Sequence, residues 1–554
     1  MTRTEQIFFS ISLLSLLLLN SCTVVDFQKL KTDNPYVGFC QGMDCVLFLE
    51  EVDEGNMKGR LYLDSGDVMA VPVAFTTDVK RNGKGCLRIG DRRMNLKLSV
   101  TEDAVQGRLR AARKTALFSL QLQRVEEYPF RAMYKEPFYE VAVDSGRVYA
   151  HGVSGYWSSY PDTREDFGTI YLKKVKYLAS TRDLDLDMDL YYPKESEKQK
   201  RPLLLLIHGG AFYNGDKQDT GYPELGRHFA ELGYVVASIN YRLGFRPLAA
   251  NVDCAGFRAL QDAHAAVCYL MANADEFGID TASIFAAGSS AGAITALNLA
   301  FMRNENRPET VAKSDIGNID AVSGANDRDF QVKAVVNMWG ALHDADMLKN
   351  SKSTAVLSFH GDADRIVPYA FGYPFDNVLE PYKRKIIESL PKFLQFVVEL
   401  EKKWSKNSIP FNHWVFNPMY GSAAIHEKAA ALAMRSEMHT CQGCGHSLHV
   451  DEKGELSDYF RDTILPDMTR FLYEELIGGV KVEITRAEAD GRWFEAAGAR
   501  NIAELHWQVE GGCVVGENDH KVKVMLFSDA PRHSVTACGK YKTGVEFRET
   551  TESF

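Results

Sequence analysis

A serine between two glycines lies near the middle of the chain, in the stretch Gly288-Ser289-Ser290-Ala291-Gly292. A serine hydroxyl attacks a carbonyl carbon efficiently only when a neighbouring base takes up its proton and an acid orients that base. Glycines on both sides let a strand and the following helix approach closely, with Ser290 exposed on the turn between them. This short motif is weak by itself, so the other members of such a set must be found elsewhere in the chain.

Candidate acids and a candidate base follow Ser290. The stretch AVLSFHGDADRIVPY begins with residues typical of a buried strand. That strand ends at two acidic residues, Asp362 and Asp364. The later stretch CQGCGHSLH places His446 in a loop after a helical segment. The order serine, acid, histidine is the α/β-hydrolase order and differs from those of chymotrypsin and subtilisin.

Backbone amides are also needed, because negative charge develops on the substrate oxygen during attack. Gly209 and Gly210 follow the apolar stretch RPLLLLIH, and without side chains they can offer their N–H groups to a substrate. The amide of Ala291 lies at the expected start of a helix, where the helix dipole favours negative charge. His208 is a second candidate base, but we expect it to hydrogen-bond within its own loop.

The elements around these residues predict a layered sheet. The apolar stretches RPLLLLIH, YVVASINY and ASIFAA are typical of strands buried on both faces. Helical periodicity follows them over 222–233, 256–278 and 291–302. This alternation predicts an α/β fold with a mostly parallel sheet covered by helices, and such sheets carry their chemistry at the carboxyl ends of the strands.

Residues from about 165 to 477 resemble an α/β-hydrolase of the esterase and lipase group, through the motifs HGGAF, GSSAG, HGDADRIVPY and GCGHS. In that family the acid lies three residues before the valine, which selects Asp364 over Asp362. The histidine follows a glycine in a late loop, which selects His446 over His449. This chain departs from the common pattern at Ser289, where an acidic residue often stands.

The resemblance implies a role for each residue. Ser290 attacks the acyl carbonyl, His446 moves the proton, and Asp364 fixes the imidazole tautomer and stabilises its cation. The amides of the oxyanion hole come from Gly209, Gly210 and Ala291. No cofactor and no metal are expected.

A rival hypothesis concerns the histidine loop, which contains five residues of types that bind zinc: His439, Cys441, Cys444, His446 and His449. A Cys-x-x-Cys pair is a common zinc spacing, and a metal here would occupy the base. The same spacing also fits a local disulfide between Cys441 and Cys444, or two packed thiols.

The N-terminus predicts export. About 13 apolar residues, IFFSISLLSLLLL, are too few to cross a hydrocarbon core of about 30 Å, so they favour a signal peptide. LNSC resembles a lipobox, which makes Cys22 the predicted site of lipid attachment. We expect a bacterial membrane lipoprotein on the periplasmic or cell-surface face, bound to the membrane only through this lipid. Nine further cysteines remain, an odd number.

Four parts are expected: the lipoprotein signal peptide 1–22, an all-β domain 30–128, the α/β-hydrolase domain 129–478 and a β domain 479–554. The stretch HWQVEGGCVVGENDHKVKVMLF in the last part resembles PKD-like, immunoglobulin-like (Ig-like) β-sandwich modules. The net charge of −10 argues against nucleic acid as a partner.

The predicted function is that of a serine carboxylic-ester hydrolase (a carboxylesterase) acting on a small ester or an acylated sugar, such as an acetyl or feruloyl ester. A second hypothesis is a serine peptidase of the prolyl-oligopeptidase type, although the N-terminal β segment is too short for a seven-bladed propeller. A third is an inactive surface-binding lipoprotein.

Overall fold

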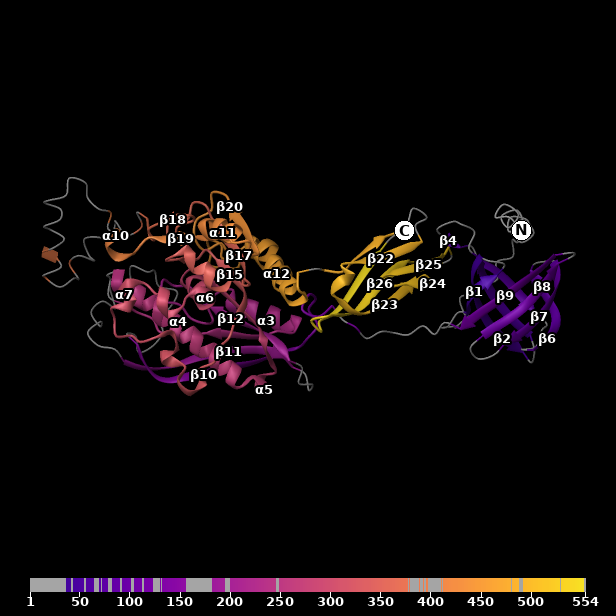
Figure 1. Ribbon diagram of the computed structural model, residues 1–554, viewed down its shortest axis with the longest axis horizontal. Coiled ribbons are helices and arrows are strands. Elements are labelled where there is room, and N and C mark those ends of the chain that lie inside the picture. Colours follow the sequence, from indigo (N-terminus) through magenta and orange to yellow (C-terminus); the bar gives the residue numbers. More distant parts are fainter. Residues whose placement is uncertain are drawn as a thin grey trace. The chain divides into compact units, whose positions relative to one another are not determined.

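The computed structural model describes residues 36–552 with gaps, of which the longest are 156–181 and nearly all of 379–409; 123–129 and several shorter stretches also lie outside it. The first 35 residues, and with them the leader and Cys22, are outside the described residues. The chain divides into two compact units (Figure 1). One is Met133–Gly479, and the other combines Met1–Ala132 with Val480–Phe554.

The unit Met133–Gly479 is built on an eight-stranded sheet with the order β10-β11-β13-β12-β14-β15-β17-β20. Strand β11 pairs antiparallel with both of its neighbours, and all the other pairs are parallel. The strands are β10 (Val141–Gly155), β11 (Arg182–Pro193), β12 (Arg201–Ile207), β13 (Val235–Ile239), β14 (Ile279–Ser289), β15 (Val332–Met338), β17 (Ala355–Gly361) and β20 (Ser436–Cys441). This is the α/β-hydrolase fold, and the predicted fold class is confirmed.

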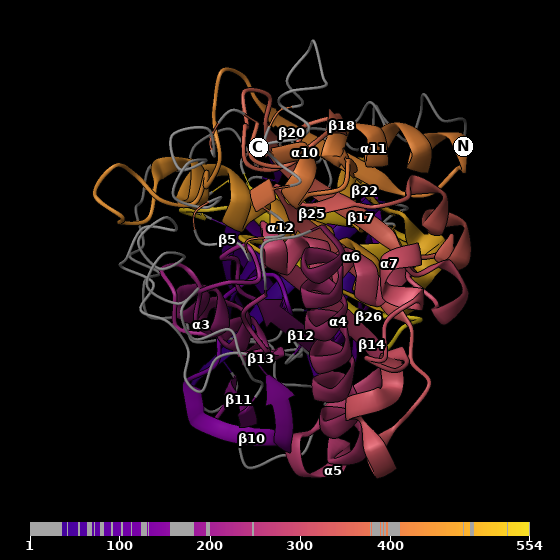
Figure 2. The same ribbon diagram turned by 90° about the vertical axis from the view of Figure 1, so that its left-hand side faces the viewer.

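Helices cover this sheet. The main ones are α3 (Tyr222–Leu232), α4 (Ala249–Ala272), α6 (Ala291–Phe301), α11 (Ser422–Ala431) and α12 (Leu465–Ile477). Figure 2 shows α4 and α6 side by side over the strands, and the two helices contact each other. Every residue of β12, β13 and β17 is buried, as expected for strands covered on both faces. These buried strands hold the loops at their carboxyl ends in fixed positions.

Short helices and small strands complete this unit. The helices are α5 (Ala274–Phe277), α7 (Glu309–Ala312) and α10 (Asn412–Val415), and a three-stranded sheet joins β16 (Ala341–Leu342), β19 (Met419–Gly421) and β18 (Phe371–Gly372). The segment between Asp364 and His446 has a sequence typical of an added helix and loop, and nearly all of 379–409 within it lies outside the described residues. Within the described part of the chain, no helix combines the length and apolar character needed to span a membrane.

The other unit is all β. Its N-terminal part is a closed barrel of β1 (Tyr36–Cys40), β2 (Met43–Asp53), β3 (Asn56–Leu63), β5 (Pro72–Thr77), β6 (Asn82–Ile89), β7 (Arg92–Val100), β8 (Ala104–Ala111) and β9 (Lys114–Leu122). Its C-terminal part contains two sheets, formed by β21 (Glu483–Arg486), β22 (Trp493–Ala497), β25 (Lys521–Phe527) and β24 (Gly512–Asn518), and by β23 (Ile502–Glu510), β26 (Ser534–Tyr541) and β27 (Glu546–Glu552).

The barrel and the C-terminal sheets share an apolar cluster in which Tyr62 stacks on Phe527 with ring centroids 4.0 Å apart. Strand β4 (Met69–Ala70) pairs with β25 and extends the C-terminal sheet. Cys513 and Cys538 are separate, buried thiols. The resemblance to PKD-like modules stays a prediction.

Candidate active site

Ser290 occupies a sharp turn between β14 and α6. Its backbone has φ 55° and ψ −119°, a region that residues with side chains rarely adopt. The Ser290 amide donates to the Met338 carbonyl oxygen at 2.8 Å, which ties the turn to the neighbouring strand β15. A Cβ atom on Gly292 would lie 1.9 Å from the Ile207 carbonyl oxygen, and one on Gly288 would lie 2.4 Å from the Gly292 carbonyl carbon. Only glycine therefore fits at these two positions.

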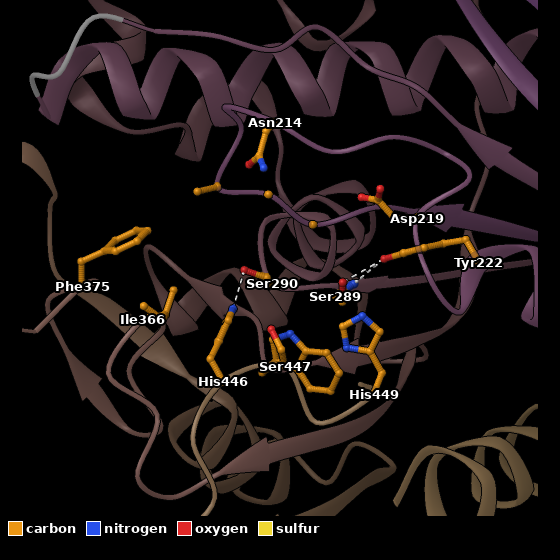
Figure 3. A pocket seen from close by; sticks show the side chains of 14 residues that line it. Asn214, Asp219, Tyr222, Ser289, Ser290, Ile366, Phe375, His446, Ser447 and His449 are labelled. Atoms are coloured by element: carbon orange, nitrogen blue, oxygen red, sulfur yellow. Dashed lines mark hydrogen bonds between the residues drawn. The ribbon is translucent and has the colours of Figure 1, made fainter. Parts of the chain in front are cut away.

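Three side chains distant in sequence meet at this turn. His446 Nε2 lies 2.9 Å from Ser290 Oγ, as Figure 3 shows, and His446 Nδ1 lies 2.6 Å from Asp364 Oδ2. Each residue follows the carboxyl end of a different strand of the sheet: β14, β17 and β20. The structure thus brings Ser290, Asp364 and His446 within hydrogen-bond reach in the predicted order.

The Asp364 carboxylate is fully buried and surrounded by donors. Its Oδ1 atom accepts the backbone N–H groups of Ile366 at 2.7 Å and Val367 at 3.2 Å. Burial raises the pKa of Asp364, but hydrogen bonds from His360 and His446 outweigh it and hold the pKa well below its ordinary value. The carboxylate is therefore ionised at neutral pH and can stabilise an imidazolium ion.

Asp362, the second candidate acid, has a different partner. Its Oδ1 atom accepts the Gly443 N–H at 2.6 Å, and its own amide donates to the Cys441 carbonyl oxygen at 3.2 Å. Cys441 and Cys444 form a disulfide, one of the three arrangements that fit their spacing in the sequence. Asp362 thus binds the disulfide loop directly ahead of His446.

Two of the residues that the rival hypothesis assigns to zinc, His439 and His446, contact different side chains. His439 stacks on Phe359 and lies 3.5 Å from Asp467, whereas His446 faces Ser290. Among the described residues, the metal-ligand types that group most closely lie elsewhere, with donor atoms within 4.8 Å of one another: His264, Cys268 and Asp327.

The predicted amide donors lie beside Ser290. A Cβ atom on Gly209 would lie 3.4 Å from Ser290 Cβ. Gly210 has φ 94°, and a Cβ atom there would lie 1.9 Å from the Asn214 carbonyl oxygen, so the loop requires glycine. Ala291 directly follows Ser290 as the first residue of α6 and is buried. These positions allow backbone amides to face a substrate oxygen above Ser290.

His208 supports this loop. Its ring is completely buried, lies against Tyr241 with ring centroids 4.3 Å apart, and places Nδ1 2.9 Å from the Gly209 carbonyl oxygen. Burial lowers the pKa of His208 to about 4, so the ring stays neutral at neutral pH. The Tyr241 hydroxyl lies 2.9 Å from the His208 carbonyl oxygen and 3.0 Å from that of Gly209.

A cavity of about 290 Å³ opens at Ser290. Figure 3 shows Phe375 and Ile366 on one side of Ser290, and Asp219, Tyr222 and His449 on the other. The full set of lining residues is Gly209, Gly210, Ala211, Asn214, Asp219, Tyr222, Ser289, Ser290, Trp339, Ile366, Phe375, His446, Ser447 and His449. The cavity therefore has an apolar side and a polar side.

Two features of the site were not predicted. The Tyr222 hydroxyl donates to the Ile207 carbonyl oxygen at 2.8 Å and lies 2.9 Å from Ser289 Oγ, so a buried tyrosine–serine pair stands where the family often has an acid. His449 stacks on Trp339 with ring centroids 5.2 Å apart. Burial, followed by the charge of His446, lowers the pKa of His449 to about 4, so His449 is a neutral wall of the cavity.

Comparisons with known proteins found a family model and curated esterases that match part of the chain. The BD-FAE family model matches residues 188–355. Gut esterase 1 of Caenorhabditis elegans is 31% identical over 168 residues, which cover 29% of this chain and 30% of that protein. Esterase-5B of Drosophila persimilis is 33% identical over 119 residues, or 21% of each chain. The chain thus spans less than a third of the length of these curated relatives.

Two solved structures are similar at low identity. Esterase 2 of Thermogutta terrifontis, phosphoramylated by tabun, has a TM-score of 0.33 and 17% identity, over 54% of this chain and 92% of that one. A truncated carbohydrate esterase from gut microbiota has a TM-score of 0.33 and 17% identity, over 61% and 98%. The strand order and parallel pairing described above are those of the α/β-hydrolase fold, and the segment of the unit Met133–Gly479 that matches the BD-FAE family model contains Gly209, Gly210 and Ser290.

Proposed function

We propose that this protein is a serine carboxylic-ester hydrolase. The observation that carries the proposal is the hydrogen-bonded series Ser290, His446 and Asp364, with Ser290 held at positive φ on the turn before α6. A nucleophile, a base and a buried ionised acid in this arrangement activate a hydroxyl for attack on an acyl carbon.

In the first step, Ser290 Oγ attacks the ester carbonyl carbon while His446 Nε2 takes up the hydroxyl proton. The amides of Gly209, Gly210 and Ala291 stabilise the resulting oxyanion. His446 then returns the proton to the leaving alkoxide, which departs as the alcohol. Water, activated by the same imidazole, cleaves the acyl-enzyme, releases the free acid and regenerates Ser290.

Ester hydrolysis, rather than peptide hydrolysis, is supported by the segment similarity. Two curated relatives that match part of the chain carry the names Gut esterase 1 and Esterase-5B. The BD-FAE family match, residues 188–355, includes the Ser290 turn, whereas Asp364 and His446 lie beyond it. The inference therefore rests on the family match for the segment with Ser290. For Asp364 and His446 it rests on the hydrogen bonds described above.

The substrate class we propose is a small ester or an acylated sugar, such as an acetyl or feruloyl ester. The cavity supports this class because the Asp219 carboxylate and the Asn214 amide suit sugar hydroxyls, while Phe375 and Ile366 suit an acyl or aryl group.

We also propose export as a lipoprotein anchored through Cys22, with the PKD-like, Ig-like module as a C-terminal spacer or binding part. Metabolic labelling with a tagged fatty acid tests the anchor. The label is expected on the full chain and is expected to be lost in Cys22→Ser; a Cys22→Ser variant that keeps the label contradicts this assignment.

A fluorophosphonate probe tests the nucleophile on the purified full chain. Labelling at Ser290 is expected, with complete loss in Ser290→Ala and retention in Ser283→Ala, which changes a buried serine on β14, the strand that ends directly before Ser290. Absence of labelling in folded protein would instead favour an inactive surface-binding lipoprotein. A panel of aryl esters, acetylated sugars and short peptides then separates the esterase from a peptidase of the prolyl-oligopeptidase type.

A further inference from the structure

A second imidazole contacts the acid of the proposed triad. His360 lies near the end of β17 and is completely buried. Its Nε2 atom is 3.2 Å from Asp364 Oδ2, the same oxygen that His446 Nδ1 approaches at 2.6 Å. One carboxylate oxygen thus faces two histidines, of which only His446 reaches Ser290.

The surroundings of His360 define its tautomer. Nε2 also lies 3.3 Å from the Val367 carbonyl oxygen, so it faces two acceptors and carries the hydrogen. Nδ1 lies 2.7 Å from the hydroxyl of Ser422, the first residue of α11. Ser422 Oγ also lies 3.5 Å from the Gly340 carbonyl oxygen, and His360 Nε2 donates towards Asp364 whichever acceptor takes the Ser422 hydrogen.

The side-chain amide of Asn337 holds Ser422 in place. Asn337 Nδ2, at the end of β15, donates to Ser422 Oγ at 2.9 Å, and Asn337 Oδ1 accepts the Gly340 N–H at 2.8 Å. Asn337, His360 and Ser422 are all completely buried. In a low-dielectric interior such a satisfied network is rigid, and it holds the carboxylate in one rotation.

We propose that His360 is a positioning residue that donates a hydrogen bond to Asp364 Oδ2 and thereby limits the basicity of His446. This inference rests on the proposed ester hydrolase function. A carboxylate that already accepts an N–H from His360 stabilises the His446 imidazolium less than an unshared carboxylate does. His360 also prevents Asp364 from turning away from His446, so it affects the chemical step without touching substrate.

The titratable groups that face His360, in the part of the chain that the structure describes, are Asp364 and Tyr369. The Tyr369 ring lies edge-on at 5.7 Å between centroids, and its hydroxyl is 2.7 Å from Thr440 Oγ1. The partners contributed by β15 and α11, Asn337 and Ser422, do not ionise. A change at His360 therefore reaches His446 through Asp364.

The pH profile of kcat/KM for an aryl ester tests the proposal, with the full chain and the variants His360→Leu and His360→Gln. In His360→Leu, the loss of a hydrogen bond to a charged group is expected to lower kcat at least about tenfold with little change in KM. The acidic limb is expected to move to higher pH by about half a unit or more, because Asp364, with one hydrogen-bond donor fewer, then stabilises the His446 imidazolium more strongly. His360→Gln, whose amide can donate in place of Nε2, is expected to recover part of both effects.

His426→Gln is the matched control, because His426 also pairs with a serine, Ser436 at 2.9 Å, but does not contact Asp364. Its profile is expected to match that of the unmodified chain. An unmoved acidic limb in His360→Leu, together with lower kcat, would overturn the proposal and leave His360 as a packing residue.

If His360→Leu does not fold, His360→Gln and Ser422→Ala decide the question. Ser422→Ala removes the partner of His360 Nδ1, and a smaller shift of the acidic limb in the same direction is expected; no shift in either variant refutes the role. Fluorophosphonate labelling separates this failure from failure of the proposed function. An unlabelled parent chain contradicts the ester hydrolase itself, whereas a labelled parent with unshifted His360 variants contradicts only this inference.

Discussion

The Lys217 ammonium lies 2.7 Å from the Asp189 carboxylate, and this ion pair joins the loop that carries Gly209 and Gly210 to the buried strand β11. Asp187 lies 3.2 Å from the same ammonium, and the Ser238 hydroxyl donates to the Lys217 carbonyl oxygen at 2.8 Å. Burial lowers the pKa of Lys217, but the hydrogen bond that it donates to Asp189 and the charges of both carboxylates outweigh it and raise the pKa. The Lys217 ammonium therefore stays charged through the neutral range.

Lys217→Met is expected to lower the free energy of unfolding by about 3 kcal/mol, because it leaves a buried carboxylate without its cation. It should also lower kcat, since the loop that supplies the oxyanion amides loses its anchor. Urea unfolding and ester kinetics measure the two effects. Lys313→Met, which removes an exposed ion pair with Glu309, is the control and should leave both nearly unchanged. Equal stability of the two variants would contradict the anchoring role.

Asp364→Asn is expected to lower kcat for an ester by about 10⁴-fold, because an amide can no longer stabilise the imidazolium or hold the correct tautomer. Asp362→Asn changes the neighbouring acid, which binds the Gly443 amide, and is expected to cost less than about tenfold. Steady-state kinetics on both variants distinguish the two candidates. A larger loss of kcat in Asp362→Asn than in Asp364→Asn would instead assign the role of the triad acid to Asp362.

The low pKa of Asp364 predicts how the stability difference between the parent chain and Asp364→Asn depends on pH. A carboxyl whose folded-state pKa is depressed contributes stability above its unfolded pKa of about 3.9, and this contribution is lost as the pH falls towards the folded value. The difference in unfolding free energy should therefore be largest near neutral pH and shrink below about pH 4. Urea titrations at several pH values measure it; a constant difference would show that the carboxylate charge is not stabilised by the fold.

Gly292→Ala is expected to prevent folding or to yield protein without labelling at Ser290. The new methyl group would lie 1.9 Å from the Ile207 carbonyl oxygen and 2.5 Å from that of His208, and both are fixed backbone atoms. Gly256→Ala within α4 is the control, since its nearest neighbour would be a Phe212 ring carbon at 3.5 Å. Alanine is the better helix former by about 1 kcal/mol, so that control should be at least as stable as the parent. Soluble yield and probe labelling compare the two.

The sequence predicted the α/β architecture because its signals are local: apolar strands, glycine turns and helical periodicity within short windows. The motifs around Ser290, Asp364 and His446 are local too, and the resemblance supplied their order. Partners set by tertiary packing could not be found in this way. Nothing in the sequence pairs Tyr222 with Ser289, because one lies in a helix and the other ends a strand 67 residues later.

The same reason applies to His360 and His449. His360 belongs to the HGDAD stretch, so its presence was visible, but its contact with Ser422 depends on a helix that begins 62 residues further along. His449 was considered only as a rejected base or a zinc ligand, and its stacking on Trp339 depends on a turn after β15. Burial and hydrogen-bond partners are properties of the assembled sheet, so sequence patterns do not specify them.

Among the strands that the structure describes, β20 ends the sheet and pairs only with β17, yet the loop that follows β20 carries His446. Border strands open more readily than central ones, since fewer backbone bonds hold them. Heat or denaturant should therefore abolish turnover while the central strands are still intact. Because activity depends on the edge strand β20, turnover should be lost before bulk spectroscopic signals show that the central strands unfold.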